Sequence, residues 1–199
     1  MMKLLSGSLC LYGHACRFVM KEKDAESEAR YFGELDTTEV LGDLNPYGES
    51  PTLVDRDLVL YSPIVINEFL DERLPHPPLM PIDPVGRGRA RLLIFRLQRD
   101  WLDNIHAHLS KNQKLDQKTR KELWEGLLAM SQIFANQDYL LGDDMTLVDC
   151  YVAPLLWRLP TLDVELPKQG QRLVEYSERL FSRQSFQDSL SEAERELYP

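Results

Sequence analysis

The chain has 199 residues, of which 43% are apolar and 28% charged, and its formal net charge is −9. This composition is typical of a globular protein whose length allows one large domain or two small ones, each with a buried core. No apolar run is long enough for a membrane-spanning helix, and the negative charge argues against a general nucleic-acid binder, which would need a basic face.

The cysteines and the first residues favour a cytoplasmic location. Cys10, Cys16 and Cys150 cannot all pair with one another, and they lack the spacing of zinc ligands. Residues 1–13 contain a single lysine and an apolar run that Ser and Gly interrupt, which makes a poor signal peptide. We therefore expect a protein of a reducing compartment.

The acidic charge is concentrated in the first part of the chain. Residues 1–74 carry 7 Lys and Arg against 14 Asp and Glu, a net charge of −7, whereas the remaining residues carry a net charge of −2. This difference suggests two units with different surfaces. We expect an N-terminal domain over residues 1–76, a linker over 77–83 and a C-terminal domain over 84–199.

The first unit is expected to alternate strands and helices. A short apolar run ending in Ser-Gly predicts a buried strand, and two apolar runs around Asp-Arg-Asp predict a β-hairpin. Ser62 as N-cap and Pro63 at the first helical position are standard signals of a helix start. In chain order the expected elements are a strand (3–7), a helix (13–23), an edge strand (28–35), an optional helix, a hairpin (50–61) and a helix (62–74).

The second unit is expected to be all-helical. Its central helix should be buried, because residues 146–159 are apolar almost all round. Thr146 and Asp149 form the pattern of a capping box at its start, and Pro154 should kink it. The other expected helices cover residues 84–109, 119–134 and 172–186, the last as one or two helices, and residues 191–196 form a solvated acidic tail.

This order of elements resembles the glutathione transferases, which combine an α/β thioredoxin-like N-terminal domain with an all-α C-terminal domain. The segment ESPTLV (49–54) resembles the family's turn into its third strand, with Ser50 and Pro51 at the positions of the backbone contact to the thiol peptide and of the cis-proline. The segment TLVD (146–149) matches the family's N-capping box. The resemblance covers essentially the whole chain and implies a transferase fold.

Three longer segments are similar to a narrower family, the stringent starvation protein A family of bacterial transferase-fold proteins. They are residues 44–58, 70–81 and 147–160, which occur in the same order. This resemblance implies a cytoplasmic homodimer that binds RNA polymerase holoenzyme, through the core, the sigma factor or both, and regulates transcription under stress. It implies no catalysis, no cofactor, no metal, no membrane contact and no sequence-specific DNA binding.

The first helix lacks a complete nucleophile site for glutathione chemistry. The position that is serine in many transferases is Gly13, which has no side chain, with Tyr12 beside it. Cys10 lies where some transferases carry the cysteine of a Cys-Pro-Tyr motif, but here the motif is Cys10-Leu11-Tyr12 without the proline. A thiolate at a helix N-terminus would be the nucleophile of an alternative function, a glutathione-dependent thiol transferase or reductase. A small buried cysteine explains the residue equally simply, and we favour that interpretation.

The predicted start of the third helix also departs from the transferases. They bind the γ-glutamyl end of glutathione with a Glu-Ser pair, and the matching residues here are Ser62 and Pro63. Proline has neither a hydroxyl nor an N–H, so donors to the glutathione carboxylate are lost, each worth about 1.5–3 kcal/mol. The residues Tyr12, Gly13, Ser50, Pro51 and Ser62 are therefore expected to form only a remnant of a glutathione site.

The proline-rich segment Pro75-His76-Pro77-Pro78 has two interpretations. Prolines stop a helix and hold two domains at a fixed angle, which makes a plain linker. His76, however, is a polar ring between prolines that cannot turn it inward, and a stiff, partly apolar ridge is a good docking surface. The residues alone leave the two interpretations equal, and the resemblance to the stringent starvation family favours a partner-binding site.

Two further groups have ordinary explanations. His106 and His108 lie two residues apart, so a helix would direct them to different sides, whereas a helical metal site needs a spacing of four. Arg87, Arg89, Arg91, Arg96 and Arg99 form a basic run that is expected to be a solvated face. This face would pair with the acidic first domain of the same subunit or of a neighbouring one.

Overall fold

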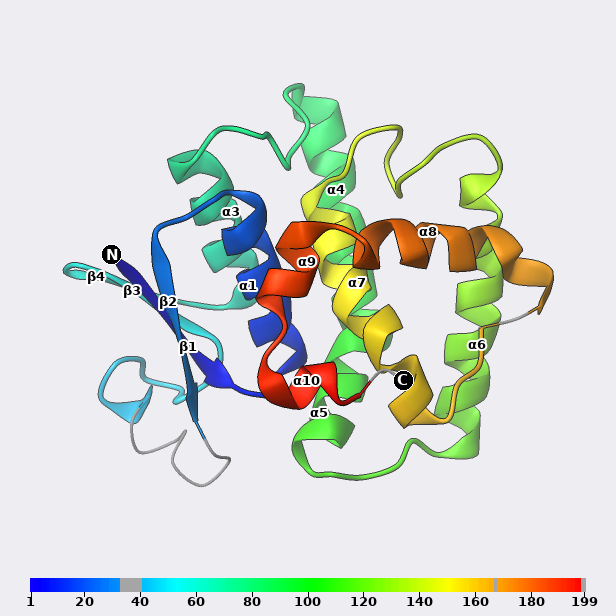
Figure 1. Ribbon diagram of the computed structural model, residues 1–199, viewed down its shortest axis with the longest axis horizontal. Coiled ribbons are helices and arrows are strands. Elements are labelled where there is room, and N and C mark those ends of the chain that lie inside the picture. The colour runs from blue at the N-terminus through cyan, green and yellow to red at the C-terminus, as the bar shows by residue number, and fades with distance from the viewer. Residues whose placement is uncertain (33–40, 167, 198–199) are drawn as a thin grey trace.

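The first unit is built on a four-stranded mixed sheet with the order β2-β1-β3-β4 (Figure 1). The strands are β1 (Met2–Gly7), β2 (Ser27–Phe32), β3 (Thr52–Asp55) and β4 (Leu58–Tyr61). β1 pairs with β2 in parallel and with β3 in antiparallel orientation, and β3 and β4 form the predicted hairpin. The computed structural model describes residues 1–32, 41–166 and 168–197. The end of the predicted edge strand, at 33–35, and part of the optional helix after it lie outside this range.

Helix α1 (Leu11–Glu22) is the centre of the first unit. It is buried from Leu11 to Met20, because the sheet covers one side of it while α3 (Pro63–Arg73) and helices of the second unit cover the others. The predicted helix start at Ser62 is correct in position. Ser62 makes no side-chain capping bond, however, and its backbone has a positive φ of 77°.

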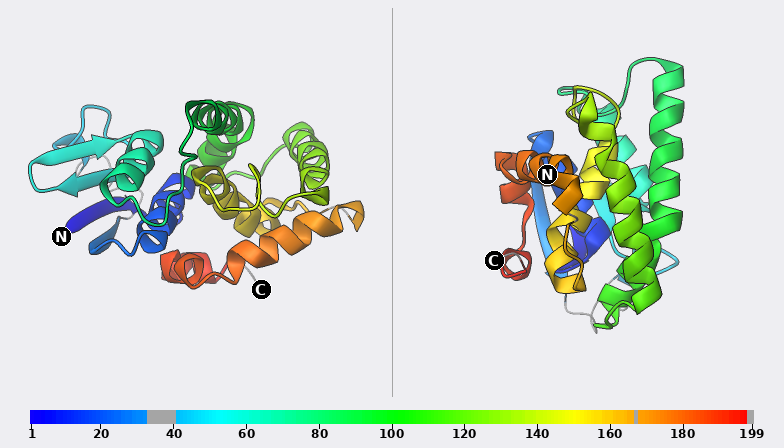
Figure 2. Two further views of the ribbon diagram at one scale, coloured as in Figure 1. Left: turned by 90° about the horizontal axis from the view of Figure 1, so that it is seen from above. Right: turned by 90° about the vertical axis from the view of Figure 1, so that its right-hand side faces the viewer.

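The second unit consists of helices, as the sequence predicts (Figure 2). They are α4 (Pro84–Leu97), α5 (Asp103–Ser110), α6 (Gln117–Ser131), α7 (Leu147–Arg158), α8 (Gln171–Phe181), α9 (Gln184–Ser189) and α10 (Glu192–Arg195). The expected single helix over 84–109 is divided, because a π-helical turn at Gln98–Leu102 separates α4 from α5. Such turns mark a local departure from regular helical hydrogen bonding and often occur near functional sites. No helix in the described ranges has the length and apolar character needed to cross a membrane.

Helix α7 is the buried core of the second unit. Every residue of α7 is buried, which confirms the interpretation of its apolar sequence. The capping box also forms as predicted: the Thr146 N–H donates to Asp149 Oδ2 at 2.7 Å, and the Asp149 carboxylate also accepts from the Tyr176 hydroxyl at 2.7 Å. The start of α7 is thus fixed both within the helix and by α8, which carries Tyr176.

The expectation of a solvated tail at residues 191–196 is wrong. These residues include α10, which lies beside the start of α1 with its Ser191–Glu194 capping box formed (Figure 1). The Glu194 side chain is fully buried, with 0% exposure. The sequence of alternating acidic and small residues suggested solvent exposure, but one of its carboxylates has two buried arginines as partners.

Candidate functional site

Cys10 and Ser50 meet where β1 ends and β3 begins, at the site that glutathione chemistry would use. Cys10 is the N-cap of α1, and its Sγ accepts a hydrogen bond from the Gly13 N–H at 3.2 Å. The Ser50 hydroxyl lies 3.4 Å from the same sulfur, and the Ser50–Pro51 peptide bond is cis, as the resemblance implied. The sequence therefore places a thiol beside a cis-proline, although only 9% of Cys10 is exposed.

Gly13 and Tyr12 do not provide a hydroxyl to this thiol site. A Cβ atom at position 13 would lie 2.6 Å from the Cβ of Ser6, which is too close for any side chain without movement of β1. The Tyr12 hydroxyl instead donates to Asp103 Oδ1 at 2.5 Å, at the start of α5. Burial raises the pKa of Tyr12, and the Asp103 carboxylate raises it further, so Tyr12 stays protonated and acts as a link to the second unit.

The start of α3 offers few donors to a ligand. Ser62 is exposed, and Pro63 occupies the first helical position without an N–H. The positive φ of Ser62 is a conformation that costs a non-glycine residue free energy, and the surrounding hairpin and helix maintain it. Among the predicted site residues, the structure brings Cys10, Gly13 and Ser50 into contact, whereas Tyr12 is directed to α5.

The proline-rich segment is exposed over all four predicted residues, Pro75 to Pro78. Two buried charged groups that sequence reasoning missed hold its C-terminal end in place. Lys23 Nζ donates to the Pro77 carbonyl, and it also lies 2.5 Å from Asp71 Oδ1. The same Asp71 oxygen accepts from the Leu79 N–H at 2.8 Å.

This arrangement makes the segment a supported ridge. Lys23 is only 4% exposed and Asp71 only 7%, so their attraction is little screened by water. The Leu79 carbonyl accepts from the Leu147 N–H at 2.8 Å, which ties the ridge to the start of α7 as well. Lys23 lies in the charged run Lys21–Asp24, so no local pattern in the sequence marks it as buried.

The basic run on α4 pairs partly within the chain. Arg91 makes a two-pronged contact with Glu68 at 2.9 and 2.6 Å, and Arg87 contacts Glu72 at 3.1 Å. These pairs connect α4 to α3 and agree with the interpretation of a solvated face paired with the acidic first unit. The remaining arginines of the run, Arg89, Arg96 and Arg99, are exposed.

The two histidines of α5 have separate environments. The ring of His106 packs against the ring of Tyr12 with centroids 5.1 Å apart, and burial lowers the pKa of His106. His108 Nδ1 lies 2.8 Å from the Asn104 carbonyl one turn earlier. Among the described residues, no three His, Cys, Asp or Glu side chains are grouped as metal ligands would be.

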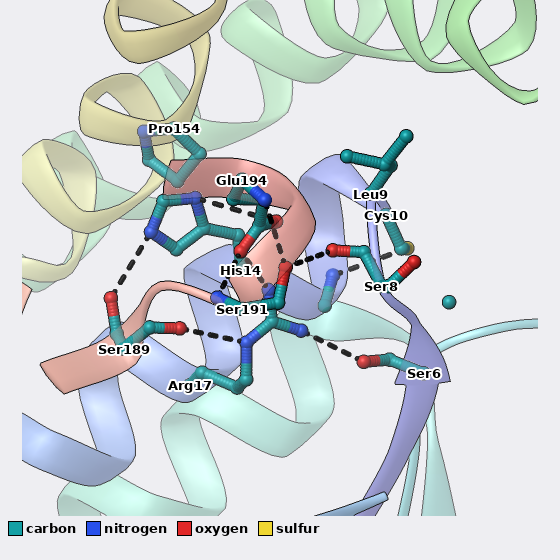
Figure 3. Close-up of polar contacts among 12 residues, drawn as sticks. Ser6, Ser8, Leu9, Cys10, His14, Arg17, Pro154, Ser189, Ser191 and Glu194 are labelled. Atoms are coloured by element: carbon teal, nitrogen blue, oxygen red, sulfur yellow. Dashed lines mark hydrogen bonds and ion pairs between the residues drawn. The ribbon is translucent and has the colours of Figure 1, made fainter. Parts of the chain in front are cut away.

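A second polar centre, not expected from the sequence, lies between α1, α7 and α10 (Figure 3). Glu194 is its hub: Oε2 accepts from Arg17 Nη2 at 2.6 Å, and Oε1 accepts from Arg158. Burial alone would raise the pKa of Glu194, but the positive charges of Arg17 and Arg158 and the hydrogen bond from the Ser191 N–H hold it at about 2. An arginine buried within an apolar helix requires a carboxylate partner. The arginines in the two apolar helices were therefore the sequence signal that could have indicated this centre.

His14 lies in the same centre and is held in one neutral form. Its Nδ1 accepts from Arg158 Nη1 at 3.0 Å, so the ring proton is on Nε2, which lies 3.1 Å from the Ser189 hydroxyl. Burial lowers the pKa of His14 well below its usual value, the two arginines lower it further, and the Glu194 carboxylate opposes them. His14 therefore stays neutral under conditions in which an unfolded histidine would become charged.

We expect the stability of the protein to fall as the pH drops below about 6.5, the pKa of an unfolded histidine. In that range the unfolded state binds a proton at position 14 and the folded state does not, which costs up to about 1.4 kcal/mol per pH unit for this one group. The variant His14→Asn keeps an acceptor near Arg158 but cannot titrate. Urea unfolding between pH 7.5 and 5.5 should show a smaller slope for the variant, and equal slopes would contradict the assignment.

The fold is that of the glutathione transferases, with a cysteine and a cis-proline meeting at the start of β3. The family model for the glutathione S-transferase C-terminal domain matches residues 87–184. A glutathione S-transferase structure from Rhodospirillum rubrum superimposes with a TM-score of 0.84 at 24% identity, covering 96% of this chain and 93% of the other. At this identity the likeness shows the fold alone.

The curated relatives narrow the class. The stringent starvation protein A homolog of Coxiella burnetii is 43% identical over 98% of this chain and 94% of its own length. The homolog of Pasteurella multocida is 43% identical over 95% of this chain and 90% of its own length. The chain belongs to the stringent starvation protein A family.

Proposed function

We propose that this protein is an RNA polymerase-associated regulator of transcription in the stress response, acting in the cytoplasm without catalysis. Membership of the stringent starvation protein A family supports the proposal. So does the net charge of −9, because an acidic adaptor suits basic patches on polymerase or sigma factor better than it suits DNA. The protein would contribute a binding surface, with the transferase fold as its scaffold.

The observation that carries the proposal is the exposed ridge Pro75–Pro78 on its buried support. A docking segment is most effective when its conformation is fixed before binding, since ordering a loop costs free energy. The Lys23–Asp71 pair fixes the backbone on both sides of Pro78 while leaving the ridge itself exposed. A linker that left the two units free to move would need no such support.

The direct test is recovery of polymerase by the intact protein. We expect the immobilised protein to retain RNA polymerase core subunits and sigma factor from a native bacterial lysate, and purified holoenzyme to bind it in the absence of other proteins. Failure of purified holoenzyme to bind at micromolar concentration would reject the proposal.

We predict that the protein binds glutathione weakly and does not transfer it to a chlorinated aromatic acceptor. Gly13 cannot carry a hydroxyl without a clash with Ser6, and Pro63 removes donors to the glutathione carboxylate. Titration calorimetry should show no binding at micromolar glutathione, and a chromogenic assay should show no turnover above background. Micromolar affinity would contradict the prediction.

A thiol transferase or reductase is the second candidate function, and the position of Cys10 favours it. The sulfur lies at the N-terminus of α1, where the helix dipole favours negative charge, and beside the cis-Pro51 backbone. The discriminating measurement is reduction of a mixed disulfide with glutathione as electron donor. Reductase activity that disappears in Cys10→Ser would establish this function. The result of this assay does not depend on whether the protein binds polymerase.

We also predict a symmetric homodimer that pairs the first unit of one chain with the helices expected at 84–109 and 119–134 of the other, which are α4, α5 and α6 here. The outer face of α4 exposes Val85, Leu92 and Phe95 by 64%, 58% and 53%, which is a costly arrangement for a monomer. Light scattering should give twice the 23.1 kDa of the chain. The variant Phe95→Glu should yield monomer, whereas a wild-type mass of one chain would refute the dimer.

A further inference from the structure

The turn that carries Cys10 is held in place from the second unit. The Ser8 carbonyl accepts from the Ser191 hydroxyl at 2.7 Å (Figure 3). The Leu9 carbonyl accepts from Arg158 Nη2 at 3.3 Å. Ser8 and Leu9 are the two residues directly before Cys10 in the chain. The backbone position of the thiol therefore depends on α7, which carries Arg158, and on Ser191, the N-cap of α10.

The side chain of Arg158 is itself held by α10. Its Nη2 atom donates to the Glu194 carboxylate as well as to the Leu9 carbonyl. Arg17, which contacts the other oxygen of Glu194, donates through Nη1 to the Ser6 hydroxyl in β1 at 2.9 Å. Glu194 thus connects α10 to both sides of the turn, to β1 through Arg17 and to Leu9 through Arg158.

α10 depends on these contacts for its own position. It is a single helical turn, Glu192–Arg195, and so short a helix has no stability in isolation. The side chains of Ser191 and Glu194 attach it to the rest of the protein. The Trp157 indole N–H adds a hydrogen bond to the Glu194 carbonyl at 2.8 Å. Loss of a few polar contacts is therefore enough to release α10 locally.

The segment before α10 has separate anchors on α1. Glu22 contacts Arg183 and accepts from the Ser185 hydroxyl. The Ser189 carbonyl accepts from Arg17 Nε at 2.9 Å. α9, which ends at Ser189, can therefore stay attached to α1 while α10 moves.

The thiol lies just below the surface of the protein. Cys10 is 9% exposed, whereas Leu9 beside it is 46% exposed. A small movement of the turn would bring the Cys10 sulfur into contact with solvent. Cys16 and Cys150 are different, because both are 0% exposed and lie within helices α1 and α7.

We propose that α10, together with its cap Ser191, is a latch on the Gly7–Cys10 turn, and that local release of this latch exposes the Cys10 thiol to thiol-reactive molecules. With the latch in place, the turn is fixed and the sulfur is covered. With the latch released, the Ser8 carbonyl loses its partner and the turn is free to move. The coupling is reciprocal, so a bulky group on Cys10 favours the released latch. The latch acts on the thiol site alone and requires no polymerase binding.

The first experiment measures how fast each cysteine reacts with N-ethylmaleimide in the folded protein, by mass spectrometry of the digested chain. Replacing Ser191 by alanine removes both the donor to the Ser8 carbonyl and the acceptor that caps α10. We expect Cys10 to react at least tenfold faster in Ser191→Ala than in wild type. Cys16 and Cys150 should react at unchanged rates.

The buried cysteines separate local release from general unfolding, because they become accessible only when the core opens. A parallel rise in the rates of Cys10 and Cys150 would show general destabilisation and overturn the latch, and so would an unchanged rate at Cys10. The matched control Ser182→Ala removes an exposed hydroxyl that donates to the Arg179 carbonyl. It should react like wild type at all three cysteines, and an equal acceleration of Cys10 by this control would also overturn the latch.

The second experiment tests the coupling in the opposite direction. The Trp157 indole N–H donates to the Glu194 carbonyl, so its nitrogen-15 NMR signal reports whether α10 is in place. Complete modification of Cys10 with a bulky maleimide should move the Trp157 signal and leave that of Trp124, on α6, unchanged. The variant Cys10→Ser, treated in the same way, should show no change. A Trp157 signal that stays in place after complete modification of Cys10 would refute the latch.

Discussion

Replacing Glu194 by glutamine is expected to lower the free energy of unfolding by about 3–5 kcal/mol, the usual effect of removing one partner from a buried ion pair. The substitution keeps the shape of the side chain but leaves two guanidinium groups, on Arg17 and Arg158, in a buried site without a counter-charge. An amide oxygen can accept from one of them, but it cannot offset the desolvation of either. Urea denaturation at pH 7 measures the effect directly.

Two features make this measurement specific. The matched control Glu196→Gln lies just beyond α10 and is exposed, so it should stay within about 0.5 kcal/mol of wild type. The pKa of Glu194 is lowered to about 2, so its contribution is complete above the unfolded value near 4.3 and is lost as the pH falls towards 2. The difference in the free energy of unfolding between wild type and Glu194→Gln should therefore become smaller at acidic pH. A loss below 1 kcal/mol at pH 7 would show that the arginines find other partners.

The triple replacement of Pro75, His76 and Pro77 by alanine is expected to weaken binding to RNA polymerase at least tenfold and to leave dimerisation unchanged. All three residues are exposed, so their loss removes no core packing, and proline loss adds chain entropy worth about 0.4–1 kcal/mol per site. Binding energy is concentrated in few residues, and losing a central one commonly costs about 2 kcal/mol. His76→Ala alone should show the same direction with unchanged thermal unfolding.

The control for this experiment is a triple alanine variant at Arg172, Glu175 and Glu178, exposed residues of α8 on a different face. It should bind polymerase like wild type. The plain-linker interpretation expects the opposite pattern for the ridge variant, with disturbed domain packing and normal polymerase binding. A ridge variant that loses cooperative unfolding yet still captures polymerase would show that residues 75–77 act as a hinge.

Local signals in the sequence predicted most of the fold. The Thr146–Asp149 capping box and the Ser62–Pro63 helix start depend on residues a few positions apart, so their pattern is visible in one short segment. The cis bond before Pro51 followed from the family resemblance and is present. The π-helical turn at 98–102 was not predicted, because leucine and aromatic spacing looks nearly the same in a regular helix and in one with an inserted turn.

The site was predictable only where its residues are adjacent in sequence. The exposure of Pro75–Pro78 was predicted, but the support by Lys23 was not, because Lys23 and Pro77 are 54 residues apart. The linker also packs on the start of α7 through the Leu79–Leu147 backbone hydrogen bond, which no local pattern encodes. Glu194 was misassigned for the same reason, since its role depends on Arg17, far earlier in the chain.

The distance between Arg17 and Glu194 has a consequence for the order in which the chain acquires its structure during synthesis. The two residues are 177 positions apart, so a ribosome that adds roughly 5–20 residues per second makes the carboxylate about 10–35 s after the arginine. Until Glu194 has been made, the Arg17 cation on α1 lacks the carboxylate that neutralises it in its buried position. The first unit, although earliest to emerge, is thus expected to reach its final packing only with α10 in place, and the two units should unfold together in one transition.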